Sequence, residues 1–311
     1  MKHFDADATA QALPFPALIA ALERMFVAGC DVPARHVHAV GDALTALLMP
    51  AWLPGRYFGL KVVNVARGNA ALGLPGLFAT YQLFDANTGA PLAQIDGGEI
   101  TARRTAAASA LAASRLARTD ARRQLIVGAG RVSGLLAPAY RAVRQIDDVL
   151  VWSRDPEAAL RLVIRLAAEG HPARVVTDLA TAAPTADIVS CATLSAEPLI
   201  QGAWLAPGSH LDLIGGFTPA MREADDACFA GAQVWIDTAD ALAKAGDLLH
   251  PIEAGVLRRE DVRGTLADLA STRRLARDRA ARTVFKSVGT ALEDLAAAIV
   301  VYESRQAGEL R

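Results

Sequence analysis

Hydrophobic and polar positions follow one pattern before Asp120 and another after it. In the first part, apolar side chains recur with a helical period over Phe15–Ala28. β-type apolar runs follow at residues 46–50, 57–65 and 76–84, and residues 85–89 are typical of a hairpin turn before another short strand. An alanine-rich helix is expected over residues 99–117. This part therefore predicts a mixed sheet with several antiparallel strands.

After Asp120, short apolar runs alternate with segments of helical length. Strands are expected at residues 124–127, 149–152, 173–176, 187–192, 210–214 and 234–236. Helices are expected over residues 132–144 and 156–168, and a last helix over about 275–304. Strand–helix alternation with this spacing predicts a parallel, doubly wound sheet.

Length and pattern together predict two domains. At 311 residues the chain exceeds the usual size of a single hydrophobic core. The expected fold class is α/β, with a Rossmann domain built on a doubly wound parallel sheet over residues 118–286. A separate α+β domain is expected from residues 1–117, with residues 287–311 packing back on it.

Composition excludes several classes of function. Hydrophobic residues make up 52% and charged residues 21%, as in a well-buried globular protein. The 33 acidic and 32 basic residues nearly cancel, and no basic stripe carries interleaved aromatics, so nucleic acid is not expected as a partner. Anionic small molecules remain open, because a few local arginines suffice to bind them.

Targeting signals, cysteines and histidines indicate a cytoplasmic protein without a metal. The first residues lack the stretches of a signal peptide, and no apolar run is long enough to span a membrane. Three widely spaced cysteines argue for a reducing compartment. His36 and His38 form a His-x-His pair, but no acidic or cysteine partner is near them in sequence, so no metal site is expected.

A glycine-rich turn between strand and helix indicates a dinucleotide site. Gly128 permits the tight turn, and Gly130 lets the backbone approach a pyrophosphate. Arg131, Val132 and Ser133 open the following helix, whose N-terminus offers free N–H groups and a positive dipole. The third motif position is Ser133 rather than glycine or alanine, and the motif is weak without its strand and helix. With them it predicts that these five residues bind the cofactor.

The end of the second Rossmann strand favours NADPH, with NADH as the alternative. A carboxylate here would bind the ribose 2′-hydroxyl and repel a 2′-phosphate. The chain instead has Ser153 and Arg154, a hydroxyl and a guanidinium that suit a 2′-phosphate, while Asp155 is expected to cap the next helix. An ordinary exposed arginine is the competing interpretation.

Basic side chains also occur at unusual places in the first domain. Lys61 lies inside an apolar strand, where a lysine either protects a sheet edge or directs its charge into a cleft. Arg103 and Arg104 lie near a helix start, which is unfavourable against the helix dipole unless an anion is near.

Together these segments resemble the ornithine cyclodeaminase/μ-crystallin family. The matching segments are residues 59–63, 96–109, 126–130, 152–154, 187–193, 213–219 and 245–247, in family order over nearly the whole chain. The resemblance implies that the N-terminal domain binds the substrate and forms a homodimer, completed by the C-terminal helix. It also implies that the Rossmann domain binds NAD(P).

The resemblance assigns roles to individual residues as well. Arg35, Lys61 and Arg104 match the basic residues that hold a substrate carboxylate. Thr193 and Ser195 match the loop near the cofactor ribose, and Val288 and Gly289 match the turn near the nicotinamide; a helix kink is the other interpretation of that glycine.

Phe217 is the informative departure from the cyclodeaminases. Its position resembles an aspartate that handles protons while ammonia leaves and the ring closes, and phenylalanine has no acid or base group. Asp212, five positions upstream on a strand, is not expected to replace it. The chain is more similar to the ketimine-reductase branch, whose members reduce Δ1-pyrroline-2-carboxylate to L-proline and often Δ1-piperideine-2-carboxylate to L-pipecolate.

The expected activity is therefore NAD(P)H-dependent reduction of a cyclic imino acid. The alternatives are ornithine cyclodeaminase, an amino-acid dehydrogenase that forms alanine from pyruvate and ammonia, and a binding protein without turnover. Lys61 is a further candidate for setting the protonation state of the imine, because burial can lower the pKa of a lysine.

Overall fold

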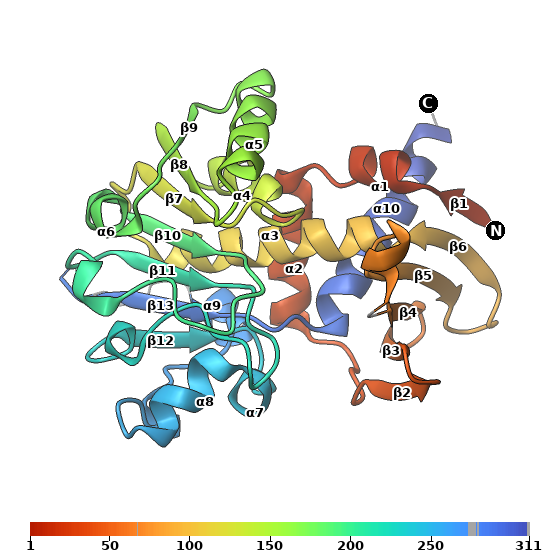
Figure 1. The fold of residues 1–311 in the computed structure, drawn as a ribbon. Helices are drawn as coiled ribbons and strands as arrows, with labels where there is room; N and C mark the ends of the chain where they lie inside the picture. The colour runs from red at the N-terminus through yellow and green to blue at the C-terminus, as the bar shows by residue number, and fades with distance from the viewer. Residues whose placement is uncertain (67, 273–277, 279, 310–311) are drawn as a thin grey trace. The chain divides into compact units, whose positions relative to one another are not determined.

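The computed structural model describes residues 1–66, 68–272, 278 and 280–309 (Figure 1). Contacts divide the chain into two compact units. Unit 1 is Met1–Arg104 with Thr290–Arg311, and unit 2 is Thr105–Gly289.

Unit 1 is built on a six-stranded mixed sheet in the order β1-β6-β5-β4-β3-β2. The strands are β1 (Lys2–Phe4), β2 (His36–Val40), β3 (Leu44–Leu53), β4 (Tyr57–Ala66), β5 (Leu77–Asp85) and β6 (Pro91–Asp96). β1 runs parallel to β6, and the remaining pairs are antiparallel. The expected hairpin turn lies between β5 and β6, where Asp85 Oδ1 accepts hydrogen bonds from the backbone of Asn87 (2.9 Å) and Thr88 (2.8 Å).

Three helices accompany this sheet, and α3 begins in the same unit. They are α1 (Ala6–Ala12), α2 (Phe15–Ala28) and α10 (Ala291–Glu309), with α3 (Gly97–Leu116) running on into unit 2. α2 coincides with the predicted helix and buries the apolar face that its period marked. α10 packs against α2 and against β3 and β4, so the end of the chain completes the fold of unit 1.

Unit 2 contains a seven-stranded sheet, all parallel, in the order β12-β13-β11-β10-β7-β8-β9. The strands are β7 (Arg123–Val127), β8 (Asp148–Trp152), β9 (Ala173–Val175), β10 (Ile188–Cys191), β11 (His210–Leu213), β12 (Gln233–Ile236) and β13 (Thr283–Lys286). The helices include α4 (Ser133–Arg141), α5 (Pro156–Ala168), α6 (Leu179–Ala182), α7 (Ala241–Lys244), α8 (Gly246–Glu253) and α9 (Leu266–Ser271). The predicted doubly wound parallel sheet is confirmed, and the strand order reverses between β7 and β10.

The expected last helix over residues 275–304 is wrong at its start. Residues 283–286 form β13, a fully buried strand between β11 and β12, and α10 begins only at Ala291. Thr-Val-Phe is a short apolar run with no exposed face, so its periodicity does not distinguish strand from helix. Of the predicted helix, residues 275–277 and 279 lie outside the described residues.

The predicted domain boundaries lie close to the ends of these units but do not coincide with them. Contacts assign residues 105–117 and 287–289 to unit 2, because α3 continues into that unit without a break. A functional division at residues 117 and 287 stays a prediction.

Two further features are the hydropathy of the helices and the hydrophobic core of unit 2. Among the described residues, no single helix is long and apolar enough to cross a membrane, and only α1 and α2 taken together, with a 75° bend, pass that test. The core of unit 2 is formed by apolar residues of its central strands, such as Leu125, Val189 and Leu211, each at most 1% exposed.

Candidate active site

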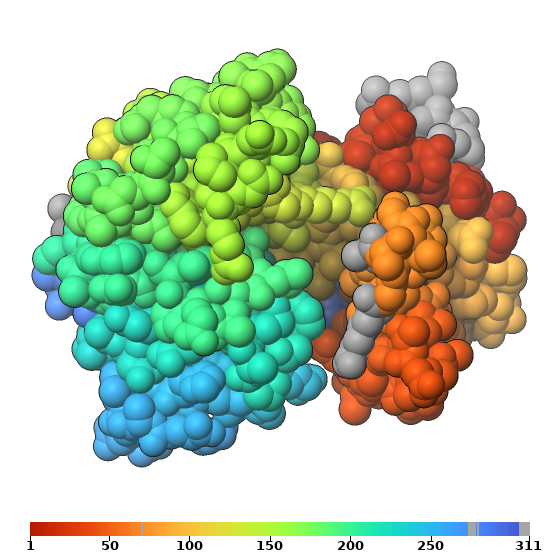
Figure 2. Space-filling model, viewed as in Figure 1, coloured from red at the N-terminus to blue at the C-terminus, as the bar shows by residue number. Residues whose placement is uncertain are grey.

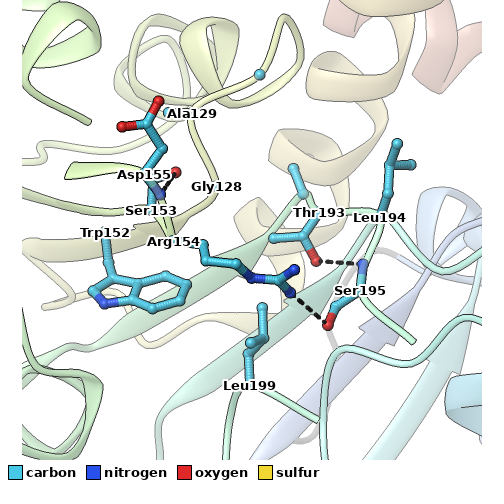
Figure 3. A pocket seen from close by; sticks show the side chains of 12 residues that line it. Gly128, Ala129, Trp152, Ser153, Arg154, Asp155, Thr193, Leu194, Ser195 and Leu199 are labelled. Atoms are coloured by element: carbon cyan, nitrogen blue, oxygen red, sulfur yellow. Dashed lines mark hydrogen bonds between the residues drawn. The ribbon is translucent and has the colours of Figure 1, made fainter. Parts of the chain in front are cut away.

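A pocket lies where the strand order of unit 2 reverses (Figure 3). Its volume is about 360 Å³, and its lining comes from the segments that follow β7, β8 and β10. In open parallel sheets, ligands bind outside the carboxyl ends of the strands at such a switch point. Of the predicted cofactor residues, Gly128, Gly130, Ser153, Arg154, Thr193 and Ser195 all line this pocket.

The two positions of the turn are occupied by glycine for different reasons. Gly128 has φ +116°, and a Cβ there would lie 2.6 Å from the carbonyl oxygen of Ala192, so the fold itself requires glycine. A Cβ on Gly130 would meet nothing within 4 Å. Nothing in the described protein explains why Gly130 lacks a side chain, whereas a ligand lying against the backbone does.

The helix that follows the turn places the remaining motif residues. Ser133 is the first residue of α4 and is buried, with its Oγ 3.5 Å from the carbonyl oxygen of Ala192. It therefore fills the motif position that brings helix and strand close together. Val132 precedes the helix and is half-buried, and Arg131 is exposed beside it.

The end of β8 presents a guanidinium to the pocket. Arg154 Nη2 donates to Ser195 Oγ at 3.4 Å (Figure 3), so the loops after β8 and β10 meet across the opening. Among the described residues that line the pocket, Asp155 is the only acid. Its carboxylate accepts from the backbone of Glu157 (2.9 Å) and pairs with Arg161 (3.3 Å), which confirms the expected helix cap.

Val288 and Gly289 follow β13 and do not line this pocket. Both backbone N–H groups donate to Asp237 Oδ2, at 2.7 and 2.6 Å. Gly289 has φ +76° and lies outside any helix, so the interpretation as a helix kink is wrong. A role of this turn near a nicotinamide stays a prediction.

Unit 1 contains a buried cluster of cations and carboxylates. Lys61 on β4 is 1% exposed, and its Nζ lies 2.6 Å from Asp294 Oδ2 and donates to Thr101 Oγ1 at 3.2 Å. Arg104 on α3 is 6% exposed and pairs through Nη1 with Glu293 (2.5 Å) and through Nε with Asp294 (3.1 Å). Lys61 and Arg104, predicted from sequence as one site, thus share the Asp294 carboxylate.

Burial has the largest effect on the charge of Lys61. Loss of hydration lowers its pKa to about 8, and nearby Arg104 acts in the same direction, while Asp294 opposes both. A lysine with such a pKa changes charge near physiological pH, so the cluster can gain or lose a proton. Lys61 does not protect a sheet edge, because its strand β4 lies between β3 and β5.

The other basic residues of the first unit have different positions. Arg35 lies in the segment before β2 and is half-buried. Arg103 donates through Nη1 to the carbonyl oxygen of Leu13 (3.2 Å) and through Nε to Glu99 (2.7 Å), so it ties α3 to the segment between α1 and α2. Arg103 is therefore a structural residue, and Arg104 is the one that faces the cluster.

Asp212, the acid considered as a replacement for the aspartate missing at position 217, is held elsewhere by hydrogen bonds. Phe217 is 52% exposed. Asp212 is fully buried on β11 and accepts from Tyr140 (2.7 Å) and Ser109 (3.2 Å), with its pKa raised to about 7 by burial. The Asp212 carboxylate is hydrogen-bonded inside the core of unit 2, so it does not replace an acid at position 217. Within the described residues, no group of three or more His, Cys, Asp or Glu side chains is placed to hold a metal ion.

Sequence reasoning missed the buried acids, Glu293, Asp294 and Glu223. Glu293 and Asp294 occupy the first turn of α10, where acidic residues are ordinary partners of the helix dipole. Glu223 lies in an irregular segment, where no periodicity or motif in the sequence marks it as buried. The usable signal for the first pair was the occurrence of Lys61 and Arg104 at positions where a cation requires a nearby anion.

The parallel sheet, the glycine turn and the pocket at the switch point define a dinucleotide-binding protein of the Rossmann type. The chain belongs to the ornithine cyclodeaminase/mu-crystallin family, whose model matches residues 10–309. The resemblance seen in the sequence is thereby confirmed.

Three relatives illustrate what the chain is similar to. A Δ1-pyrroline-2-carboxylate reductase of Paracoccus denitrificans is 43% identical over 81% of this chain and 80% of its own. The Thermococcus litoralis Δ1-pyrroline-2-carboxylate reductase, solved with NADH and L-proline, has a TM-score of 0.92 at 30% identity, covering 99% of this chain and 98% of its own. An archaeal alanine dehydrogenase dimer with bound NAD has a TM-score of 0.91 at 27% identity, covering 99% and 97%.

Proposed function

We propose that this protein is an NAD(P)H-dependent reductase of cyclic ketimines. It converts Δ1-pyrroline-2-carboxylate to L-proline and Δ1-piperideine-2-carboxylate to L-pipecolate by hydride transfer to C2 of the imine. The observation that carries the proposal is a dinucleotide pocket together with two buried cations, in a chain 43% identical to a Δ1-pyrroline-2-carboxylate reductase.

The residues of the pocket suit a dinucleotide. Gly130 leaves open space beside the backbone, and the N-terminus of α4 presents N–H groups suited to a pyrophosphate. Arg131, Val132 and Ser133 form that helix start, and Thr193 and Ser195 line the pocket from the loop after β10. When bound, the reduced nicotinamide supplies a hydride. The turn at Val288 and Gly289 is expected to contact the nicotinamide end of the cofactor.

Lys61, Arg104 and Arg35 hold the substrate carboxylate in this proposal. The Lys61 and Arg104 charges are balanced by Asp294 and Glu293, which keep both cations in place without a substrate. Charge-assisted hydrogen bonds then orient the planar imino acid, so that C2 is presented in one direction only. A protonated cyclic imine is already electrophilic at C2, and no further acid is needed at position 217.

NADPH is the preferred cofactor in this proposal, because Arg154 presents a guanidinium where a carboxylate would select NADH. Arg154→Ala should raise the Kd of NADPH about 10-fold or more and leave the Kd of NADH within about 2-fold, since it removes one charge-assisted contact. Fluorescence titration of the protein with each dinucleotide measures both values. Arg174→Ala, which removes an exposed arginine of β9 that pairs with Asp148 away from the pocket, is the control. Equal weakening of both cofactors by Arg154→Ala would contradict the assignment.

The functional unit is proposed to be a homodimer. Part of the unit 1 sheet is uncovered: all five residues of the edge strand β2 are exposed, as are Leu77 and Phe78 at the start of the inner strand β5, at 46% and 48%. β2 and β3 contribute to the orange surface in Figure 2. Exposed apolar sheet surface is normally covered by a partner, and the archaeal relative is a dimer.

Charge placed on this surface should separate the copies. Phe78→Lys is expected to convert the dimer to a monomer in sedimentation velocity, because an ammonium would be buried without a partner. Leu160→Lys replaces an apolar residue that is 52% exposed on α5 and should leave the dimer intact. A Phe78→Lys protein that sediments as a dimer would place the interface elsewhere.

The cytoplasm is the proposed compartment. Cys30, Cys191 and Cys228 are all free thiols, and the latter two are buried. Free cysteines are typical of proteins kept in a reducing environment.

A direct assay distinguishes the proposed activity from two alternative enzyme activities. Purified protein is mixed with NADPH or NADH and each cyclic imine, and the nicotinamide absorbance is followed. The proposal predicts oxidation of NADPH with both imines and formation of proline or pipecolate. Oxidation only with pyruvate and ammonia would favour the alanine dehydrogenase activity, in line with the archaeal neighbour. Ammonia release from L-ornithine with NAD⁺ would show that a cyclodeaminase works without an acid at 217.

A further inference from the structure

A buried carboxylate beside the cofactor pocket has no part in the chemistry described so far. Glu223 is fully buried, and its two oxygens accept hydrogen bonds from two loops. Oε1 accepts from the backbone N of Thr193 (2.6 Å) and from its Oγ1 (2.8 Å). Oε2 accepts from the backbone N of Gly215 (2.7 Å) and Gly216 (3.4 Å). One side chain therefore joins the loop after β10 to the loop after β11.

The surroundings of Glu223 hold it in this position. Its backbone N donates to Asp247 Oδ1 (2.7 Å), and Asp247 Oδ2 pairs with Lys286 on β13 (3.0 Å). A Cβ on Gly215 would lie 1.8 Å from the carbonyl oxygen of Thr193 and 2.6 Å from Glu223 Oε1, and one on Gly216 would lie 2.5 Å from Asp247 Oδ2. Gly215 thus lets the loop after β11 pack against the Thr193 backbone and Glu223, and Gly216 makes room for Asp247.

A chain of hydrogen bonds leads from this carboxylate into the pocket. Thr193 Oγ1 donates to Glu223 and accepts from the backbone N of Ser195 at 3.3 Å (Figure 3). Ser195 Oγ in turn accepts from Arg154 Nη2 at 3.4 Å. The carbonyl oxygen of Glu223 also accepts from the backbone N of Leu199 (2.8 Å), another residue of the pocket lining. The position of the guanidinium therefore depends on groups that Glu223 fixes.

We propose that Glu223 is a positioning residue for the cofactor: through Thr193 and Ser195 it sets where Arg154 meets the adenosine ribose, and so controls the preference for NADPH over NADH. The inference rests on the proposed dinucleotide site but not on the substrate. A carboxylate that served only to hold the loops together would affect stability or the binding of both cofactors alike. A carboxylate that positions Arg154 affects the two cofactors differently.

The test is Glu223→Gln, read as the ratio of the Kd values of NADH and NADPH. The amide keeps the size of the side chain but has one acceptor oxygen, so donors of one loop lose their partner. The ratio is expected to fall about 5- to 10-fold, as for the loss of one typical hydrogen bond. Asp225→Asn is the matched control, because that carboxylate accepts from the backbone of Gly202 and Cys228 outside the pocket. It should leave the ratio unchanged.

Two further variants keep the test decisive. Thr193→Val preserves shape and breaks the link to Ser195 without exposing a buried charge, so it decides the matter if Glu223→Gln fails to fold. Ser195→Ala should lower the ratio as well, and Glu223→Gln added to it should lower it no further, because residues that act through one path are not additive. An unchanged ratio in Glu223→Gln and Thr193→Val, or full additivity with Ser195→Ala, would overturn the inference alone. Wild-type protein that binds neither dinucleotide would overturn the proposed function with it.

Discussion

Lys61→Met is expected to lower kcat/KM for the cyclic imine about 100-fold or more. The ammonium is one of the cations proposed to hold the substrate carboxylate, and its loss leaves Asp294 with Arg104 as its remaining ion-pair partner in the described cluster. Removing one member of a buried charged contact costs about 2–5 kcal/mol. Steady-state kinetics with saturating NADPH measure the effect. Lys244→Met, which removes a lysine paired with Asp240 on a solvent-accessible helix, should leave kcat/KM unchanged.

The same variant should change the pH dependence. The pKa of Lys61 is about 8, so the ammonium is present below that pH and is lost as the pH rises through it. Because kcat/KM reports groups of the free enzyme, the wild-type value should fall over this range, and the fall should be absent in Lys61→Met. If the variant only weakens substrate binding and leaves the pH profile of turnover unchanged, Lys61 does not set the protonation state of the imine.

Gly128→Ala is expected to destabilise unit 2 by about 3 kcal/mol, because a side chain at φ +116° is strained and its Cβ would lie 2.6 Å from the carbonyl oxygen of Ala192. Gly130→Ala, two residues along the same turn, meets nothing within 4 Å. It should therefore keep wild-type stability and instead raise the Kd of both dinucleotides about 10-fold, a loss of about 1.4 kcal/mol.

Chemical denaturation and dinucleotide titration of the two variants separate these effects. The pair provides its own control, since the same methyl group is added in the same turn. A Gly130→Ala protein with wild-type affinity for both cofactors would mean that no ligand approaches the backbone there. A Gly128→Ala protein of wild-type stability would mean that the turn relaxes freely.

Local patterns were sufficient to predict the parallel sheet of unit 2 and its glycine turn, except for β13. The strand, turn and helix around Gly128 are contiguous in sequence, so their order alone indicates the chemistry. Residues 156–168 and 15–28 carry clear helical periods and form helices with those bounds. β13 was missed because a strand buried on both faces has no alternation to read.

The charged cluster of unit 1 could be predicted only in part. Lys61 and Arg104 stood out because a cation in an apolar strand and one near a helix start both require a reason. Their partner carboxylates are distant in sequence, with Arg104 and Glu293 separated by 189 positions, and such pairings arise from tertiary packing. Glu223 was hidden for a similar reason, since its four donors come from loops that only the folded sheet brings together.

Isotope transfer tests whether the nicotinamide passes a hydride to C2 of the imine. The protein is supplied with NADPH carrying deuterium at the transferable position and with Δ1-pyrroline-2-carboxylate, and the proline formed is analysed by mass spectrometry and NMR. We expect L-proline with one deuterium at the α-carbon. Absence of proline, or proline without deuterium at that carbon, would contradict hydride transfer to C2 and with it the assignment of this site.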